Sequence, residues 1–420
     1  MDKMLIEGSA KLKGEASVGG SKNASLPVMV AALLAEGPSV IEGVPRLKDI
    51  DTMSAVLGQL GATASQEGSR LQVDSRGLDK FEAPYDLVRT MRASIYVMGP
   101  LLARLGKARV SLPGGCAIGQ RPIDYHLKGF EALGAKIKLE HGYVEATAKK
   151  LKGARIVFDK PSVGATCNVM MAATLASGTT WLHNPAQEPE IVDLAGFLNR
   201  MGAQVSGAGT DCITIKGVSA LKPCEYRIIP DRIEAATLVA AAAITGGAVT
   251  LRHCRLSDLG IVSEKFQEYG VKLSEGDEGR DTVKVTVGKA RKAVHICTMP
   301  HPGFPTDMQA QWMALMTVTK GTSVITETIW ENRFMHISEL ERMGADIRVQ
   351  GNSAVVSGVP RLSGAPVMAS DLRASAALLL AGLAAKGETE VSRIYHLDRG
   401  YERLEKKLEA LGAKIRRVPE

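Results

Sequence analysis

A short signature recurs six times along this chain and limits the folds that it can adopt. An apolar or aromatic residue is followed by Gly and then by Ala or Val, and successive glycines lie 68 to 74 residues apart. The six glycines are Gly61, Gly134, Gly202, Gly270, Gly344 and Gly412. This spacing is longer than the roughly 20–50 residues of the common solenoid repeats. It predicts six copies of one globular supersecondary unit.

Each unit has the same internal pattern. The signature closes a segment with helical periodicity, such as residues 51–60, so its glycine is expected at a helix C-terminus. A strand-like stretch follows, as at residues 135–139, and an Ala-rich segment of helical length precedes it, as at residues 23–34. Each unit therefore predicts helix, strand, helix, strand, strand, and six units predict an α/β chain. The simplest partition is two domains of three units, with a boundary near residues 226–231, although a duplicated scaffold alone says little about activity.

Composition narrows the class of protein. Apolar residues make up 45% and charged residues 23%, which is typical of a globular protein and excludes a disordered one. The formal net charge of +7 fits an anionic small substrate as well as it fits nucleic acid. The N-terminus has no apolar signal segment, and the most apolar run, residues 235–251, is shorter than the roughly 20 residues that span a bilayer. We therefore expect a cytoplasmic protein.

Several common active-site motifs are absent from the sequence. The eight histidines form no H-x-x-x-H or H-E-x-x-H pattern, and the six cysteines form no C-x-x-C pair, so no metal site is expected. The sequence also contains no phosphate-binding G-x-x-x-x-G-K-[ST] loop, no strand-linked G-x-G-x-x-G and no G-x-S-x-G elbow. These absences predict a protein without a resident cofactor.

The first residues of the Ala-rich helices differ from unit to unit. The expected starts are Ser21-Lys22-Asn23, Thr90-Met91-Arg92, Pro161-Ser162-Val163-Gly164, Asp231-Arg232, Thr306-Asp307 and Ser370-Asp371. Ser, Thr and Asp are ordinary N-caps, which explains most of these positions without any ligand. Lys22 and Arg92, however, add positive charge where the helix dipole disfavours it. An anionic ligand at these helix ends would account for both.

Residues 111–124 form the most unusual segment, because a Pro and three Gly surround Cys116. Such a composition predicts a loop. Arg121 lies five residues later and could lower the pKa of the Cys116 thiol or hold an anion beside it. The functional interpretations are a general acid, a nucleophile or a redox sensor, and the alternative is a small residue in a tight turn. The other five cysteines are expected to pack in the interior.

Two arginines near turns are weaker candidates. Arg333 lies in a Glu-Asn-Arg-Phe-Met-His segment, and Arg399 precedes the last expected helix. Taken alone, each is equally well explained by a surface ion pair.

Five motifs together resemble those of the enolpyruvyl transferases. They are Ser-Lys-Asn-Ala at 21–24, Leu-Pro-Gly-Gly-Cys at 112–116, Gly-Gln-Arg-Pro at 119–122, Phe-Pro-Thr-Asp-Met-Gln at 304–309 and Asp-Leu-Arg-Ala at 371–374. The resemblance extends from end to end. It implies two inverse α/β-barrel domains of three repeats each, one formed by residues 22–230 and the other by residues 1–21 with 231–420, and an active site in the cleft between them.

The resemblance also implies a reaction and its catalytic residues. An enolpyruvyl group would pass from phosphoenolpyruvate to the 3-hydroxyl of UDP-N-acetylglucosamine, in the first committed step of peptidoglycan precursor synthesis. Cys116 would supply the acid and bond covalently to the donor, which also implies sensitivity to fosfomycin. Asp307 would be the base. Lys22, Arg121 and Arg399 would clamp phosphoenolpyruvate, with Arg92 close by, and the Cys116 loop would close over the site.

The resemblance assigns the contacts to the nucleotide sugar to two stretches of chain and three single positions. The residues are Asn23, Arg121, Pro122, Ile123, Asp124, Tyr125, Lys160, Ser162, Val163, Gly164, Asp307 and Ile329. Asp371 is either a participant in proton transfer or only the N-cap of its helix.

Two other functions remain open. A sister enzyme of the same family acts on shikimate 3-phosphate, but the Cys116 loop and the Asn23 position argue against that acceptor. A binding protein for nucleic acid would need clustered basic residues with interleaved aromatics, whereas aromatics make up only 4% of this chain. We expect small-molecule substrates, no nucleic-acid or membrane partner, and a monomer.

Overall fold

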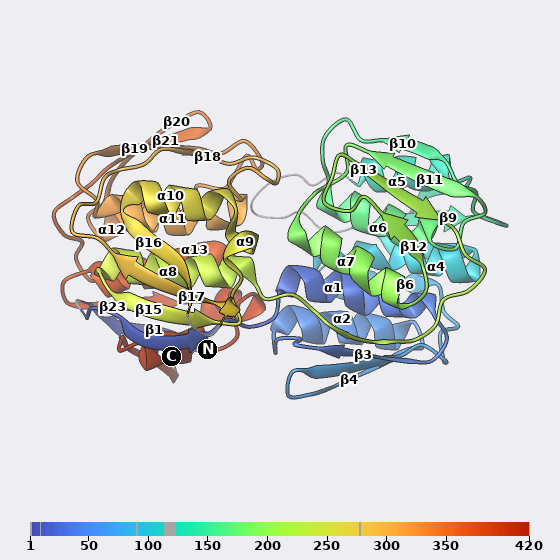
Figure 1. Ribbon diagram of the computed structural model, residues 1–420, viewed down its shortest axis with the longest axis horizontal. Coiled ribbons are helices and arrows are strands. Elements are labelled where there is room, and N and C mark those ends of the chain that lie inside the picture. The colour runs from blue at the N-terminus through green and yellow to red at the C-terminus, as the bar shows by residue number, and fades with distance from the viewer. Residues whose placement is uncertain (1, 9, 90, 113–122, 277–278, 420) are drawn as a thin grey trace. The chain divides into compact units, whose positions relative to one another are not determined.

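The computed structural model describes residues 2–8, 10–89, 91–112, 123–276 and 279–419 of the chain (Figure 1). These residues divide into two compact units. The terminal unit contains the described residues up to Gly19 together with those from Pro230 onward, and the central unit contains the described residues from Gly20 to Ile229. Each unit has its own hydrophobic core.

The described chain forms six four-stranded sheets, three in each unit, in agreement with the sixfold repetition of the sequence. The sheets of the central unit have the orders β14-β3-β5-β4, β6-β7-β9-β8 and β10-β11-β13-β12. Their strands are β3 (Pro38–Glu42), β4 (Thr63–Glu67), β5 (Arg70–Asp74), β6 (Glu82–Ala83), β7 (Lys107–Ser111), β8 (Lys136–Glu140), β9 (Tyr143–Thr147), β10 (Arg155–Val157), β11 (Thr179–His183), β12 (Gln204–Ser206), β13 (Cys212–Lys216) and β14 (Glu225–Arg227).

The sheets of the terminal unit have the orders β16-β17-β15-β2, β18-β19-β21-β20 and β22-β23-β1-β24. Their strands are β1 (Asp2–Glu7), β2 (Lys13–Ser17), β15 (Ala248–Arg252), β16 (Val271–Gly276), β17 (Gly279–Val287), β18 (Ile296–Cys297), β19 (Thr322–Thr326), β20 (Asp346–Gln350), β21 (Ser353–Ser357), β22 (Pro366–Met368), β23 (Glu388–Ser392) and β24 (Lys414–Pro419).

The helices of the central unit are α1 (Lys22–Ala31), α2 (Lys48–Gln59), α3 (Tyr85–Val88), α4 (Met98–Leu105), α5 (Asp124–Ala132), α6 (Val163–Ala173), α7 (Pro189–Arg200) and the 3₁₀ helices η1 (Ala32–Leu34) and η2 (Arg92–Val97). Those of the terminal unit are α8 (Arg232–Thr245), α9 (Leu256–Leu259), α10 (Ile261–Tyr269), α11 (Gln309–Thr317), α12 (Ile337–Arg342), α13 (Leu372–Ala384), α14 (Leu404–Ala410), η3 (Thr306–Met308) and η4 (Ile394–Arg399).

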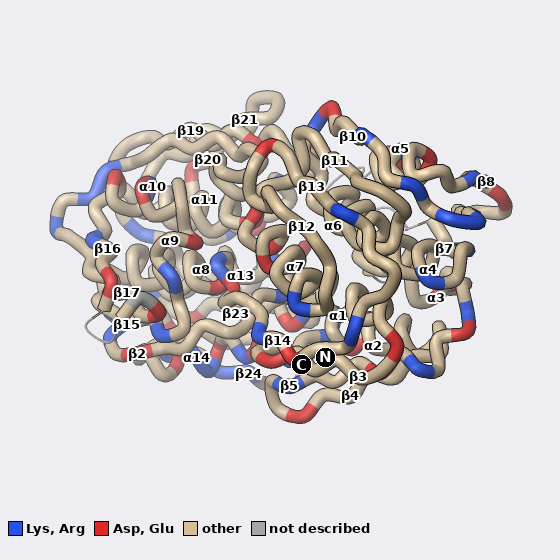
Figure 2. The backbone as a smooth tube through the Cα atoms, turned by 45° about the vertical axis from the view of Figure 1, so that its right-hand side comes forward, with Lys and Arg blue, Asp and Glu red and all other residues tan. Residues whose placement is uncertain are grey.

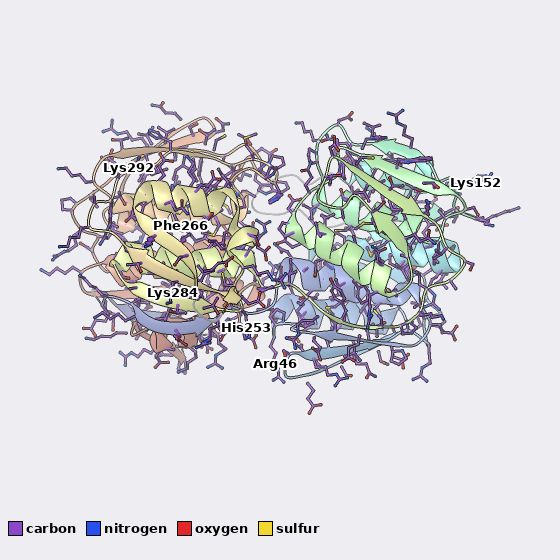
Figure 3. The ribbon with its side chains drawn as sticks, viewed as in Figure 1. Arg46, Lys152, His253, Phe266, Lys284 and Lys292 are labelled. Atoms are coloured by element: carbon purple, nitrogen blue, oxygen red, sulfur yellow. The ribbon has the colours of Figure 1, made fainter. Side chains whose placement is uncertain are left out.

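The Ala-rich helices form the interior of each unit. In the terminal unit α8, α11 and α13 pack against one another, and nearly every residue of each is buried. A helix that is apolar on all sides must be enclosed, and here sheets and outer helices cover it. Trp312 of α11 packs edge-on against Phe266, labelled in Figure 3, and against Phe304, with ring centroids 5.2 and 5.6 Å away. Aromatic side chains thus pack together beside this Ala-rich helix.

The six signature glycines end helices as the sequence predicts. All six have φ between 91° and 118°, in the left-handed region that favours glycine. They follow α2, α5, α7, α10, α12 and α14, and each precedes a strand.

The structure differs from the predicted repeat unit in two respects. Each sheet has a fourth strand that pairs in parallel with another strand, such as β10 with β11, and in five of the six sheets this strand has only two or three residues. The last unit also lacks its own final strand, because β1 from the N-terminus lies between β23 and β24. Figure 1 shows this blue strand beside the red C-terminal elements.

Candidate functional site

Lys22 is the first residue of α1, and its charge has a partner. Ser21 caps the helix by accepting a hydrogen bond from Ala24 N at 3.2 Å. The Lys22 ammonium lies 2.7 Å from a carboxylate oxygen of Asp49, in the first turn of α2. Both side chains are nearly enclosed, with 12% and 5% of their surface exposed. Asn23 follows on the same turn and is half-buried. The sequence suggested an anionic ligand as the partner of the Lys22 charge, whereas the structure shows the carboxylate of Asp49 in that role.

The starts of α5 and α6 lie together in the central unit. Ser162 caps α6 by accepting from Ala165 N at 3.4 Å, Val163 is exposed, and Lys160 before them is exposed as well. A Cβ on Gly164 would lie 3.0 Å from Nε2 of His126, in the first turn of α5.

The residues at the start of α5 also contact the segment that leads to α6. The Tyr125 ring meets Phe158 edge-on at 6.0 Å, and Ile123 and Asp124 precede it. The predicted stretches 123–125 and 160–164 are thus neighbours.

A buried His–Asn pair holds these helix starts. Asn168 of α6 donates to Ile95 O at 2.9 Å and accepts from Gly99 N at 2.7 Å, which fixes its amide orientation. Its remaining N–H faces Nδ1 of His126 at 3.0 Å, so this nitrogen accepts and Nε2 carries the proton. Burial and, to a smaller extent, the nearby positive charge of Arg92 lower the pKa of His126 to about 3. His126 is therefore a neutral ring beside the start of α6.

Asp307 lies between two buried arginines in the terminal unit. Its Oδ1 accepts from Arg333 Nη2 at 3.1 Å, and its Oδ2 accepts from Arg373 Nη2 at 3.2 Å. The arginine side chains are 5% and 4% exposed, whereas that of Asp307 is 29% exposed. Two charge-assisted hydrogen bonds orient the carboxylate, and part of the side chain remains exposed to solvent. This arrangement can accept a proton from a bound hydroxyl.

Asp371 is the N-cap of α13. Its carboxylate accepts from Arg373 N at 2.8 Å and from Ala374 N at 3.0 Å, which confirms the capping interpretation. The same cap orients the first turn of α13, from which Arg373 reaches Asp307.

Two histidines in the terminal unit are held neutral. The pKa of His336 is lowered to about 4, mainly by burial, with the charge of Asp371 opposing the shift and that of Arg333 adding to it. Burial also lowers the pKa of His396, and the charge of Arg399 at the end of η4 adds to that shift. Asp371 acts on both rings, so the terminal unit brings Asp307, Asp371 and Arg399 into one charged region.

Ile329 lies in a turn that a buried acid holds. Its N–H donates to Glu327 Oε1 at 2.7 Å, and Glu327 also accepts from the hydroxyl of Thr306, the neighbour of Asp307. The structure thereby links the predicted residues Ile329 and Asp307.

Three predicted residues, Cys116, Arg121 and Pro122, lie outside the described residues.

Sequence reasoning missed some residues of this region and misjudged others. Arg333 was expected, if not functional, to form a surface ion pair, but it is buried and holds Asp307. Arg373 was overlooked, although a cation in the first turn of a helix is the signal that singled out Lys22. Asp49 and Glu327 carry no local signal, because only the fold brings them to their partners. Cys297 is exposed, so the expectation that the other five cysteines are interior was wrong for it.

A cavity of about 430 Å³ in the central unit lies elsewhere. Residues 102–106 and 148–151 and Leu175 line it, and none of the predicted site residues is among them. Its partly buried cation, Arg104, donates inward to Leu33 O at 2.8 Å. The cavity is therefore not the candidate site.

Figure 2 shows Lys and Arg interspersed with Asp and Glu along both units. In the part of the chain that the structure describes, no helix is long and apolar enough to cross a membrane.

Comparisons with known proteins place this geometry in a family. The family model described as EPSP synthase (3-phosphoshikimate 1-carboxyvinyltransferase) matches residues 6–408. Proteins named UDP-N-acetylglucosamine 1-carboxyvinyltransferase from Trichlorobacter lovleyi and Geobacter metallireducens are 60% and 59% identical to this chain, over the full length of both sequences. The protein of that name from Yersinia pestis is 56% identical, over 100% of this chain and 99% of its own length.

Solved structures agree with this assignment. The enolpyruvyl transferase NikO from Streptomyces tendae has a TM-score of 0.88 and 28% identity, over 99% of both chains. EPSP synthase from Acinetobacter baumannii shares the fold, with a TM-score of 0.76, 18% identity and coverage of 100% of both chains. Because the family match and the identity extend along almost the whole chain, this protein belongs to the EPSP synthase (3-phosphoshikimate 1-carboxyvinyltransferase) family, whose members include enolpyruvyl transferases.

Proposed function

We propose that this enzyme transfers the enolpyruvyl group of phosphoenolpyruvate to the 3-hydroxyl of UDP-N-acetylglucosamine and releases phosphate, as the first committed step of peptidoglycan precursor synthesis. The observation that carries the proposal is the end-to-end identity of 56–60% to relatives named for this reaction. The oriented Asp307 carboxylate supports it, because the reaction needs a base for the sugar hydroxyl.

The reaction consists of an addition and an elimination. The hydroxyl oxygen bonds to C2 of phosphoenolpyruvate, the hydroxyl proton passes to Asp307, and C3 gains a proton from Cys116. The tetrahedral intermediate then loses inorganic phosphate from C2 and a proton from C3. The products are the enolpyruvyl ether and phosphate. The carboxylate and phosphate groups of phosphoenolpyruvate are negatively charged, so cations must surround the donor.

The proposed donor-binding cations are Lys22, Arg92, Arg121 and Arg399. Lys22 has Asp49 as its protein partner, and a phosphate would compete with that carboxylate or share the ammonium with it. The proposal requires groups of both units to serve one reaction, because Lys22 belongs to the central unit and Asp307 to the terminal unit.

The proposed acceptor contacts fall on the helix starts of the central unit and on two positions of the terminal unit. They comprise Asn23, residues 121–125, Lys160, residues 162–164, Asp307 and Ile329. The neutral His126 suits such a site, because a charged imidazole beside Arg92 would compete with it for an anionic ligand. We further propose that the enzyme acts as a cytoplasmic monomer, with Asp371 serving as a cap.

The test is release of phosphate from phosphoenolpyruvate. Release with UDP-N-acetylglucosamine, but not with shikimate 3-phosphate, is the expected result. A Cys116→Ser variant should lose most of this activity, and fosfomycin should inactivate the wild type. Release only with shikimate 3-phosphate would replace the proposed acceptor by that of the sister enzyme. No release with either acceptor would contradict the proposed activity.

A further inference from the structure

Glu327 is a buried acid held entirely by hydrogen-bond donors. It follows β19 and is 3% exposed. Its Oε1 accepts from Thr298 Oγ1 and Ile329 N, both at 2.7 Å, and from Trp330 N at 3.2 Å. Its Oε2 accepts from Thr306 Oγ1 at 2.8 Å. Among the described residues, no Lys or Arg forms an ion pair with Glu327, so hydrogen bonds alone compensate its burial.

The two carboxylate oxygens hold different segments. Oε1 binds the turn after β19 through the main-chain N–H groups of Ile329 and Trp330. Oε2 binds Thr306, the first residue of η3, and Asp307 is the next residue. The main chain of Glu327 is itself fixed, because its N–H donates to Asn352 O at 2.8 Å. One rigid side chain therefore joins a turn to the residue beside Asp307.

The 3₁₀ turn that carries Asp307 needs such an anchor. No side chain caps η3 at Pro305, unlike the helix at Ser21 or Asp371. The arginines hold only the carboxylate end of Asp307. The Thr306–Glu327 bond restrains the main chain behind it, and a general base must be restrained at both levels because small displacements weaken proton transfer.

We propose that Glu327 is a positioning residue that sets Asp307 for proton transfer and, through the same carboxyl group, sets Ile329 against the acceptor sugar. The inference rests on the proposed function and adds to it a residue that touches neither substrate.

Thr306→Val tests the hydrogen bond between Thr306 and Glu327, which restrains the residue before Asp307. Valine has nearly the same shape but cannot donate to Glu327, so kcat should fall by about tenfold or more as Asp307 loses its alignment. The affinity for UDP-N-acetylglucosamine, measured by titration calorimetry, should change by less than about threefold, because the hydrogen bond between Ile329 and Glu327 is intact. Thr306→Ser keeps the hydroxyl and is the matched control, with kcat near that of the wild type. The calorimetric stoichiometry gives the fraction of folded enzyme and corrects kcat for any unfolded material.

Glu327→Leu removes the hydrogen bonds to Thr306 and to the Ile329 turn at once. We expect kcat to fall and the KM for UDP-N-acetylglucosamine to rise, each by about tenfold or more, with little change in the KM for phosphoenolpyruvate. Glu327→Gln should restore both parameters, since its carbonyl oxygen can accept from the turn and its amide can donate to the Thr306 hydroxyl. A role confined to stability would lower only the fraction of active enzyme and leave both KM values unchanged.

The Asp307→Asn background shows whether Thr306 acts through Asp307. There, Thr306→Val should cause no further loss of the residual kcat, because the residue that it aligns is already disabled. An equal loss in both backgrounds, or equal kcat values for Thr306→Val and Thr306→Ser, would overturn the inference and leave the proposed function intact. A wild-type enzyme that is inactive with UDP-N-acetylglucosamine would overturn both.

Discussion

Lys22 carries a positive charge at the helix end where the α1 dipole opposes it, and a protein carboxylate offsets that cost. Its ammonium pairs with Asp49 at 2.7 Å in a nearly enclosed position. Removal of one member of a buried pair leaves an uncompensated charge, which destabilises more than the pair itself stabilises. An anion that binds at this helix end must therefore replace Asp49 as a partner of Lys22 or join it.

Asp49→Asn tests this balance. The variant should lose about 3 kcal/mol of unfolding free energy, because Lys22 stays buried without its carboxylate. Saturating inorganic phosphate should raise its Tm more than that of the wild type, since the anion supplies the missing charge. Glu82→Gln is the control, because the Glu82–Arg109 pair is far more exposed, and its loss should be below about 1 kcal/mol. Equal losses in the two variants, or an equal response to phosphate, would contradict the prediction.

His126 should make the stability of the protein depend on pH. In the fold, burial holds its pKa at about 3, whereas an unfolded histidine binds a proton below about pH 6.5. The unfolded state therefore gains the proton first, and stability is lost as the pH falls from about 6.5 toward 3. Between pH 7 and pH 5 the wild type should lose about 2 kcal/mol more than His126→Gln.

Denaturant titrations at the two pH values measure this difference. His141→Asn is the control, because His141 lies exposed in a turn with positive φ, which Asn tolerates. It should keep the pH dependence of the wild type. A His126→Gln variant that also keeps it would refute the assignment of this dependence to His126.

Helix ends could be predicted well from the sequence, and short strands could not. Ser21, Ser162, Asp231 and Asp371 are side-chain caps as expected. The two other Ala-rich segments begin with the uncapped 3₁₀ helices η2 and η3, which carry Arg92 and Asp307.

The strands and site residues that the sequence did not predict were missed for the same reason: neither has a local sequence pattern. Edge strands such as β6 and β18 have two residues each, too few to show a periodic pattern. Motif residues such as Lys22 and Asp307 could be found because the chain holds them in local patterns. Asp49, Asn168 and Glu327 could not, because their partners are brought by tertiary packing.

Matched substitutions of two signature glycines separate backbone strain from crowding. Gly61 and Gly202 have φ of 96° and 102°, so alanine is strained by about 1–2 kcal/mol at either position. A Cβ at Gly202 meets open space, whereas one at Gly61 would lie 2.1 Å from Gly77 O. Gly61→Ala should therefore destabilise by about 1–3 kcal/mol more than Gly202→Ala in denaturant titrations. Gly202→Asn should recover part of the loss, and equal effects of the two alanines would contradict this account.

At the scale of the whole molecule, the two ends of the chain are paired in one sheet. In the β1–β24 register, Asp2 is opposite Pro419, and such antiparallel partners have Cα atoms about 5 Å apart. The terminal unit thus depends on both ends of the sequence, whereas the central unit is built from a continuous stretch of described elements between them.

A circular permutant tests whether the pairing of the two ends allows them to be joined. Joining the two ends through a short Gly-Ser linker and opening the chain between Lys149 and Lys150, both exposed, should preserve fold and activity. Opening it between Ala241 and Ala242, inside the buried helix α8, should abolish folding. Circular dichroism and phosphate release are the measurements. If the permutant opened between Lys149 and Lys150 is unfolded and inactive, the prediction that the two ends can be joined without loss of the fold is wrong.

The position of β1 also has a consequence for synthesis on the ribosome. This strand is translated long before its partners β23 and β24. The described strands of the central unit have all been translated once residue 227 has emerged, so this unit can fold while β1 and β2 are still unpaired. A chain that stops before β24 leaves β1 with an open edge, the kind of surface that invites aggregation and degradation. This sheet therefore cannot be completed until β24 has been translated.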